Sequence, residues 1–460
     1  MTNKEQNSVA GAMSVMTTLF FMWGFLTCMN DILIPYLKKI FELSHFEAML
    51  VQFAFFGAYF IGSLIYFLVS VRLGDPLNRI GYKNGVIVGL VLAAIGTALF
   101  YPAATLVSYP FFLSALFVLG LGFTMLQITA NPFVAMLGSP ETASGRLNLS
   151  QGFCSLGSTI APIIGSYLVF TYFTGGGADA VKTPYLIFSL MFIGLAIFIR
   201  TSRIPTHFGV VDETEKHSNV AGALKYPHLL LGALGVFMYV GAEVGIGSMM
   251  ISFLGLPEIA GMTPAEAGGY VALYWAGLMI GRFAGAISLS NINARKKRLL
   301  MIGIPVIAFV ILLALKGSSI ALIYAIFLIL NAGMFELGRA SSKRTLTVFA
   351  CCAAALIIVG MLFSGSVSMW AIVAIGLFNS IMWSNIFTLA IDGLGEYTSQ
   401  ASSLLIMAIL GGALMPPVMG LLADSIGVHY SYFCPLVSYI YIAYYGAKGC
   451  TFNKVLKNEK

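Results

Sequence analysis

The sequence predicts an all-α integral membrane protein, on the evidence of its composition, the length of its apolar runs and an internal repeat. Of its 460 residues, 59% are hydrophobic and 9% are charged, and the mean hydropathy is +0.91. Soluble domains carry about 25% charged residues, so this composition is that of a chain in a lipid bilayer. Backbone groups in lipid must be satisfied within the span, and these runs are too long for barrel strands, so the spans are predicted to be helices.

Fourteen apolar runs predict about 14 transmembrane helices. They cover residues 13–37, 47–71, 84–106, 109–137, 147–173, 184–200, 228–254, 266–290, 298–315, 319–337, 345–364, 368–391, 401–424 and 430–448. The longest hydrophilic break, 201–227, divides them into a six-span half and an eight-span half. We therefore expect an N-terminal six-helix bundle at 1–200, a linker at 201–227 and a C-terminal bundle at 228–460.

The basic residues predict how these spans are oriented. With the N-terminus in the cytoplasm, twenty of the 25 Lys and Arg residues fall in cytoplasmic loops or tails, including the clusters at 295–298 and 339–344. Cytoplasmic loops of membrane proteins carry such an excess of positive charge. Both termini and the linker are therefore predicted to be cytoplasmic, and the net charge of +7 requires no nucleic-acid partner.

An internal repeat relates the two halves. A shift of 254 residues pairs Gly122 with Gly376, Asn131 with Asn385, Phe133 with Phe387, Gly157 with Gly411 and Pro162 with Pro416. Earlier spans need a shift of 219, which pairs Ile61-Gly62 with Ile280-Gly281. The difference of 35 residues is the size of a two-helix hairpin, and 298–338 reads as one. Without this extra hairpin, the chain consists of two parallel six-helix repeats.

The short loop after the second span carries a signature. Its sequence from Gly74 to Lys83 resembles the cytoplasmic G-x-x-x-D-R-x-G-R-K motif of the major facilitator superfamily, although Asn78 and Tyr82 depart from it. We expect its glycines to permit a tight turn, and Arg79 and Lys83 to hold the ends of neighbouring helices. Transporters of that superfamily bind substrate between two six-helix repeats, near the membrane mid-plane. The expected fold is a major-facilitator-type bundle of two six-helix repeats plus the hairpin at 298–338.

Asp31 lies within the first apolar run, eighteen residues after Met13. A carboxylate in the middle of a span costs about 2.5–3.5 kcal/mol on insertion scales, so chains keep one when it faces water, a partner or an ion path. Asp31 is therefore the candidate residue for cation coupling, with a purely structural ion pair as the alternative.

Uncharged polar side chains cluster in other spans. Gln127 and Asn131 are four residues apart, as are Asn379 and Trp383, while Asn148 and Gln151 are three apart; Glu243 lies in the middle of its span. Amides both donate and accept hydrogen bonds, so this set suits a neutral polyhydroxylated ligand whose ring stacks on Trp383. These residues could instead bond neighbouring helices, the interpretation favoured for Asn131 and Asn385 by their symmetric placement. Glu243 could also pair with another span, and Arg282 needs such a partner.

The sequence favours neither an enzyme nor a sensor. It contains no H-E-x-x-H, no paired histidines, no G-x-S-x-G and no metal-ligand spacing, so we predict no catalytic residues, no metal site and no cofactor. A sensor would need a soluble output domain, whereas the longest loop has about 27 residues. A transporter is the class that remains.

Three motifs identify a family. The segments Asn30-Asp31-Ile32-Leu33-Ile34-Pro35, Thr129-Ala130-Asn131-Pro132-Phe133 and Arg146-Leu147-Asn148-Leu149-Ser150-Gln151 resemble signatures of the L-fucose–proton symporter family. Within it, Tyr239-Val240-Gly241-Ala242-Glu243-Val244 and Gly376-Leu377-Phe378-Asn379-Ser380-Ile381-Met382 are similar to the glucose/galactose transporter branch. The resemblance covers nearly the whole chain except 298–338.

This resemblance implies cation-coupled symport of a sugar by alternating access, in a bacterial cytoplasmic (inner) membrane. It assigns coupling to Asp31 and sugar contacts to Gln151 and Trp383, with Asn30 beside Asp31 as a further candidate. Gln127 stands where the fucose member has a second carboxylate, so Asp31 acts alone and the coupling ion is a proton or sodium. Cys154 replaces another polar sugar-contacting residue, which favours glucose or galactose over L-fucose.

The expected partners are therefore a small-molecule hexose and the lipid bilayer, with the protein as a monomer. An L-fucose or other sugar symporter and an uncoupled sugar facilitator remain the alternatives.

Overall fold

The structure is a computed structural model that describes residues 9–26, 41, 45–167, 182–202, 204–205 and 222–451. Every regular element in this part of the chain is a helix. Twelve of its helical segments are long and apolar enough to cross a membrane. They are Val9–Leu26, Phe53–Leu73, Tyr82–Thr105, Tyr109–Met136, Lys182–Thr201, Pro227–Leu254, Glu266–Ser288, Ala294–Lys316, Ser318–Gly338, Ser342–Leu362, Gly365–Ala390 and Gly395–Ile426.

Two further helices lie in predicted spans outside this group of twelve. They are α7 (Ala143–Tyr167) and α19 (Phe433–Tyr444), the latter following the short α18 (Val428–Ser431). A π-helical turn, Tyr445–Gly449, extends α19. The predicted span 430–448 is therefore helical but is not one regular helix.

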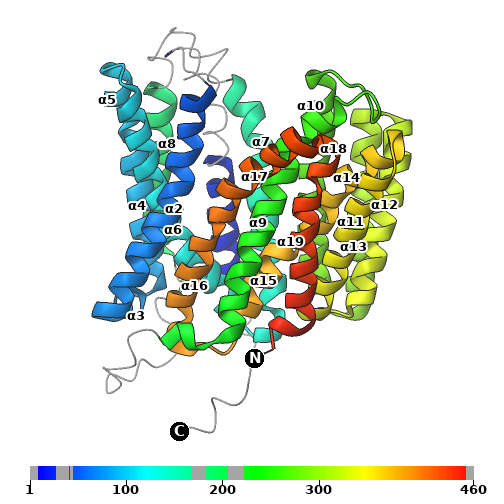
Figure 1. Ribbon diagram of the computed structural model, residues 1–460. Helices are drawn as coiled ribbons and strands as arrows, with labels where there is room; N and C mark the ends of the chain where they lie inside the picture. The colour runs from blue at the N-terminus through cyan, green and yellow to red at the C-terminus, as the bar shows by residue number, and fades with distance from the viewer. Residues whose placement is uncertain are drawn as a thin grey trace. The chain divides into compact units, whose positions relative to one another are not determined.

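The chain separates into two compact units. One contains Met1–Gly138, Phe153–Lys225 and Leu394–Met407, and the other contains Ser139–Gly152, Tyr226–Gly393 and Ala408–Lys460. In the first unit, α6 (Tyr109–Met136) packs on α2 (His45–Leu73) and α4 (Tyr82–Ala98), and α4 packs on α8 (Lys182–Thr201) (Figure 1). The short α5 (Phe100–Thr105) contacts α6 and α8, and α16 (Thr398–Met407) contacts α2 and α6.

In the second unit, α9 (Pro227–Leu254) packs on α17 (Gly411–Ile426) and α19. The helices α10 (Pro264–Ser288) and α13 (Ser342–Leu362) pack on α14 (Gly365–Asn379). The hairpin region forms α11 (Ala294–Lys316) and α12 (Ser318–Gly338), joined at Gly317, where φ is +82°. These two helices contact each other, α10 and α13, as the yellow-green part of Figure 1 shows.

Close helix packing follows the sequence repeat. A Cβ atom on Gly62 of α2 would lie 2.9 Å from the Leu121 side chain of α6 and 3.1 Å from that of Thr124. At the matching position of the second half, a Cβ atom on Gly281 of α10 would overlap the Ser380 side chain at the end of α14. Small residues thus serve the same purpose in both halves, letting two helix backbones approach.

Several predicted spans are interrupted. The run 84–106 is split at Leu99, and 401–424 is divided between α16, a 3₁₀ turn at Ala408–Leu410 and α17. The span 368–391 breaks at Ser380 and Ile381, after which α15 (Met382–Ala390) begins. Each run still corresponds to one candidate membrane span, but its helix is interrupted. The break at 380–381 places Asn379 and Trp383 on two different helices.

The signature loop has the expected tight geometry. Gly74 and Gly81 both have φ of +81°, a backbone conformation that favours glycine. Between them, Asp75 caps α3 (Pro76–Ile80) by accepting a hydrogen bond from the Leu77 amide at 3.0 Å. Arg79 donates to the Leu73 carbonyl at the end of α2, and Lys83 donates to the Ser202 carbonyl just beyond α8 at 2.7 Å. Both basic residues therefore hold helix ends, as predicted.

Candidate functional site

The predicted site residues that the structure describes fall on five helices. Asn30 and Asp31 lie outside the described residues. Gln127 and Asn131 are on α6, Asn148 and Gln151 on α7, Glu243 on α9, Asn379 at the end of α14 and Trp383 on α15. By contacts, Gln127 and Asn131 belong to the first unit and the other described members to the second.

The α6 amides bond to each other. The Asn131 side-chain amide donates to Gln127 Oε1 at 2.6 Å and to the Gln127 carbonyl at 3.1 Å. Gln127 is also a hydrogen-bond partner of Tyr59 on α2. The Tyr59 side chain is 5% exposed, and its ring packs edge-on against Phe55. The first unit therefore contains a buried, uncharged polar cluster made of two amides and one phenol.

Polar atoms on α7 and α15 are left without hydrogen-bond partners. Asn148 Nδ2 donates to Asn385 Oδ1 at 3.4 Å, while Asn385 donates to the Ser342 carbonyl at 3.1 Å. In the part of the chain that the structure describes, Asn148 Oδ1, Trp383 Nε1 and Ser384 Oγ are buried with no hydrogen-bond partner. An unsatisfied buried polar atom costs about 1–3 kcal/mol, so these atoms are suited to bind hydroxyl groups.

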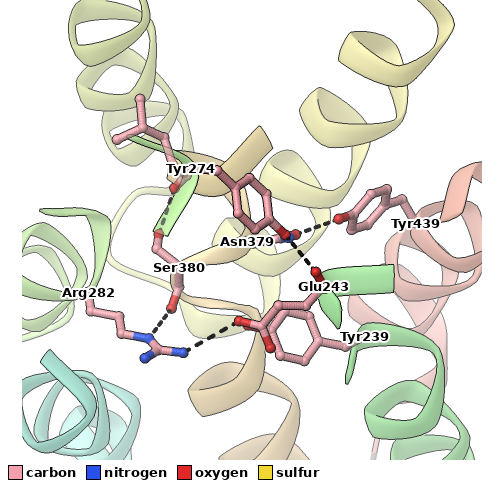
Figure 2. A network of polar contacts seen from close by, with 8 residues as sticks. Tyr239, Glu243, Tyr274, Arg282, Asn379, Ser380 and Tyr439 are labelled. Carbon is pink, nitrogen blue, oxygen red and sulfur yellow. Dashed lines mark hydrogen bonds and ion pairs between the residues drawn. The ribbon is translucent and has the colours of Figure 1, made fainter. Parts of the chain in front are cut away.

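Glu243 is the acidic member of a buried network in the second unit (Figure 2). Its Oε1 atom accepts a hydrogen bond from Tyr239 at 2.8 Å and lies 3.7 Å from Arg282 Nη2. Both charged side chains are 13% exposed. Removing one partner of a buried ion pair costs about 3–5 kcal/mol, so each charge depends on the other. Glu243 therefore forms the predicted ion pair with another helix, and this pairing does not prevent it from also being a site residue.

Two tyrosines bind the predicted residue Asn379. Its Nδ2 donates to the Tyr274 hydroxyl at 2.8 Å, and its Oδ1 accepts from the Tyr439 hydroxyl at 2.7 Å. Tyr274 in turn donates to the Glu243 carbonyl at 3.0 Å. Figure 2 shows Asn379 between the two rings. The Asn379 amide therefore connects α10, α14 and α19, and through Tyr274 it also reaches α9.

Four buried tyrosines that were not predicted as site residues bond to the predicted ones. Tyr59, Tyr239, Tyr274 and Tyr439 are buried in their spans and bond to predicted residues. Only Tyr239 had a local signal, because it precedes Glu243 by four residues and so shares its helix face. Among the described residues, no three His, Cys, Asp or Glu side chains are grouped to hold a metal ion.

The chain is similar to proteins that are named transporters. The profile of the Major Facilitator Superfamily matches residues 12–337. The chain is 42% identical over 452 residues to the glucose/galactose transporter of Brucella abortus biovar 1 (strain 9-941), covering 97% of this chain and 95% of that protein. It is 29% identical over 437 residues to the L-fucose-proton symporter of Escherichia coli (strain K12), covering 90% of this chain and 87% of that protein.

A solved structure shows the same fold. The crystal structure of the E. coli fucose:proton symporter, FucP, matches with a TM-score of 0.75 and 26% sequence identity. The match covers 95% of this chain and 98% of that structure.

Proposed function

This chain belongs to the major facilitator superfamily, and within it to the family of glucose/galactose transporters and L-fucose–proton symporters, and on this premise we propose that it is a cation-coupled symporter of a neutral hexose. Glucose and galactose are the proposed substrates, because the relative at 42% identity is named a glucose/galactose transporter. Transport proceeds by alternating access of the site to the two sides of the membrane.

The observation that carries this proposal is the set of unpartnered buried polar atoms on α7 and α15. Trp383 Nε1 is a donor and Asn148 Oδ1 an acceptor, and neither residue is charged. A sugar hydroxyl both donates and accepts, so the pair matches a neutral polyol. The indole ring, which packs at 6.0 Å from the Phe387 ring, adds an apolar face against which a pyranose ring can stack.

The proposed sugar-contacting set extends beyond these two residues. It consists of Asn30, Gln127, Asn131, Asn148, Gln151, Glu243, Asn379 and Trp383. Burial supports five of the described members, whose side chains are each less than 9% exposed: Asn131, Asn148, Gln151, Asn379 and Trp383. Gln127 and Glu243 are partly exposed. The hydrogen bonds of Asn379 and Glu243 to tyrosines support a role in which phenol hydroxyls share the sugar contact.

Asp31 is the proposed coupling residue, and the proton is the proposed coupling ion. The E. coli relative is named a proton symporter, which supports the proton over sodium. One charge crossing a potential of 100 mV supplies about 2.3 kcal/mol. At about 1.4 kcal/mol per tenfold, this corresponds to roughly fifty-fold accumulation of sugar.

We propose a topology of 14 spans for this transporter. The twelve candidate spans, together with α7 and α19, make up two six-helix repeats and the extra hairpin of α11 and α12. The proposed domains are 1–200, the cytoplasmic linker 201–227 and 228–460, with both termini in the cytoplasm of a bacterium. The protein is proposed to act as a monomer in the cytoplasmic membrane.

Uptake into proteoliposomes tests the function. Radiolabelled glucose and galactose are offered under an imposed pH gradient and, separately, under an imposed sodium gradient. Accumulation driven by the pH gradient alone is the expected result, and accumulation driven by sodium alone would replace the proton as coupling ion. Equilibration without accumulation would identify an uncoupled facilitator. Absence of uptake for both sugars, with uptake of L-fucose, would show that the protein is an L-fucose transporter instead.

A further inference from the structure

Arg282 connects two parts of the second unit. Its Nη2 atom lies 3.7 Å from Glu243 Oε1 on α9, and its Nε atom donates to the Ser380 carbonyl at 3.4 Å. Ser380 begins the break between α14 and α15. Figure 2 shows the guanidinium between the carboxylate and this carbonyl. One side chain thus contacts both an acidic group and a helix interruption.

The break is close to Arg282 for a structural reason. Gly281 and Gly277 bring the backbone of α10 against the end of α14, since a Cβ atom on Gly281 would overlap Ser380 and one on Gly277 would lie 2.9 Å from the Leu377 amide nitrogen. Trp383 follows Ser380 by three residues, at the start of α15. Trp383 therefore lies within one helical turn of the Ser380 carbonyl along the chain.

We propose that Glu243 is a proton-accepting carboxylate of the transport cycle, and that Arg282 is the positioning residue that carries its charge state to Trp383. This inference rests on the proposed hexose symport. The ionised Glu243 carboxylate attracts the Arg282 guanidinium, which therefore cannot move fully toward the Ser380 carbonyl. When a coupling proton binds a Glu243 oxygen, the carboxyl group becomes neutral and the attraction is lost. Arg282 then turns toward the Ser380 carbonyl, and release of the proton on the other side of the membrane restores the pair.

Among the described residues, Arg282 is the charged group that acts electrostatically on Glu243. Tyr239 on the same helix, Tyr274 on α10 and Tyr439 on α19 are the nearby phenols. Helix α17 faces this stretch with Met415 and Met419, which contact Gly241 and Gly245, and its Asp424 lies more than a turn beyond. Helices α14 and α15 contain no titratable side chain.

Other titratable neighbours lie toward the ends of α9, where Tyr441 of α19 donates to the Leu231 carbonyl at 2.8 Å. Phe253, near the C-terminal end, packs against His429 of α18, and the His228 carbonyl, near the N-terminal end, accepts from Tyr445. Both contacts are more than two helical turns from Glu243 along α9. Among the described residues, Arg282 is therefore the charged group that responds to a change in the charge of Glu243.

The test uses the full-length protein in proteoliposomes with hexose counterflow, which needs no cation gradient. The variants are Glu243→Gln, Arg282→Gln, Arg282→Lys and the double variant Glu243→Gln/Arg282→Gln. Glu336→Gln and Arg339→Gln, at exposed positions near the end of α12, are the matched controls. The KM for hexose is measured across pH, together with the number of protons taken up per sugar.

The expected results separate the two roles. Glu243→Gln should lose the pH dependence of the KM for hexose and take up fewer protons per sugar. Arg282→Gln should raise KM about tenfold or more, and Arg282→Lys should recover part of that loss. The double variant lacks a lone buried charge, so it should fold and show a raised, pH-independent KM.

Two outcomes would overturn the inference. One is a double variant with the KM and pH profile of the wild-type protein, which would show that the Glu243–Arg282 pair only stabilises the structure. The other is a Glu243→Gln variant whose KM keeps its wild-type pH profile. Failure of counterflow in the wild-type protein and both controls would instead count against hexose transport itself.

Discussion

Gly411 on α17 lies directly against the carbonyl oxygen of Phe237 on α9, so that a Cβ atom at position 411 would overlap that oxygen. Its partner in the repeat, Gly157 on α7, lies against the carbonyl oxygen of Phe21 in the same way. Each contact joins the first helix of a half to a later helix of that half, backbone to backbone. The repeat read from the sequence is therefore also a repeat of packing.

Replacing Gly411 with alanine should destabilise the protein. The added methyl group must push α17 from α9, and overpacking of this kind costs about 1–3 kcal/mol. Thermal unfolding in detergent should show a lower Tm. Gly420→Ala on the same helix is the control, because no atom lies within 4 Å of the added Cβ. Equal Tm values for the two variants would show that α9 and α17 are not in tight contact.

Trp383→Phe should weaken sugar binding while preserving the apolar ring. The substitution removes the buried Nε1–H, which has no partner among the described residues. Loss of one hydrogen bond to a sugar hydroxyl is worth about 1 kcal/mol, so KM in hexose counterflow should rise about fivefold to tenfold. Trp275→Phe is the control, because that indole is 43% exposed on α10. An unchanged KM for Trp383→Phe would remove the indole N–H from the sugar site.

Asp31→Asn should abolish accumulation and spare exchange. The amide cannot take up and release the coupling proton, whereas a neutral side chain of the same shape still permits alternating access. The measurement is glucose uptake under a pH gradient, compared with counterflow by the same variant. Sugar concentrated above equilibrium by the Asp31→Asn variant would show that the coupling carboxylate lies elsewhere.

Asp75 should make the stability of the protein depend on pH. Burial raises the pKa of this carboxyl above its usual value, although Ser399, Tyr66 and the Leu77 amide all donate to it. The unfolded chain loses its proton first, near the ordinary pKa of about 3.9. The contribution of Asp75 to the free energy of unfolding is therefore greatest below that pH, falls as pH rises toward the folded pKa, and is absent above it.

Asp75→Asn should remove this fall, because an amide does not titrate but can still cap α3. Tm measured across the acidic range in detergent tests the expectation. Glu141→Gln provides a control of opposite sign, since a backbone hydrogen bond and Ser139 lower the pKa of the exposed Glu141. Parallel Tm curves for the wild-type protein and Asp75→Asn would exclude the burial effect.

Composition and charge were sufficient to predict the helical spans. In lipid, an apolar run of this length must satisfy its backbone hydrogen bonds internally, which a helix does. The breaks at Leu99 and at Ser380–Ile381 were not predicted, and these residues keep backbone angles in the right-handed helical region. Arg282 was expected to need a partner, and Glu243 was one candidate for pairing. Their meeting depends on how α9 and α10 pack, which no local pattern encodes.

The hydrogen bonds of the polar residues show the same limit. Asn131 bonds within its own helix turn, so its spacing from Gln127 was informative. Asn379 bonds to Tyr274 and Tyr439, which are 105 and 60 residues away. The roles of Asn30 and Asp31 remain predictions from sequence, because both lie outside the described residues.

The enclosure of Gly365–Ala390 has a consequence for how the protein is made. This segment is the most deeply buried of the candidate spans that the structure describes. A nascent chain enters the membrane in order, so Tyr274 and Ser342 are already in the bilayer when Asn379 and Asn385 emerge from the ribosome, whereas Tyr439 comes later. Two of the hydrogen-bond partners of this segment, Tyr274 and Ser342, are therefore synthesised before it.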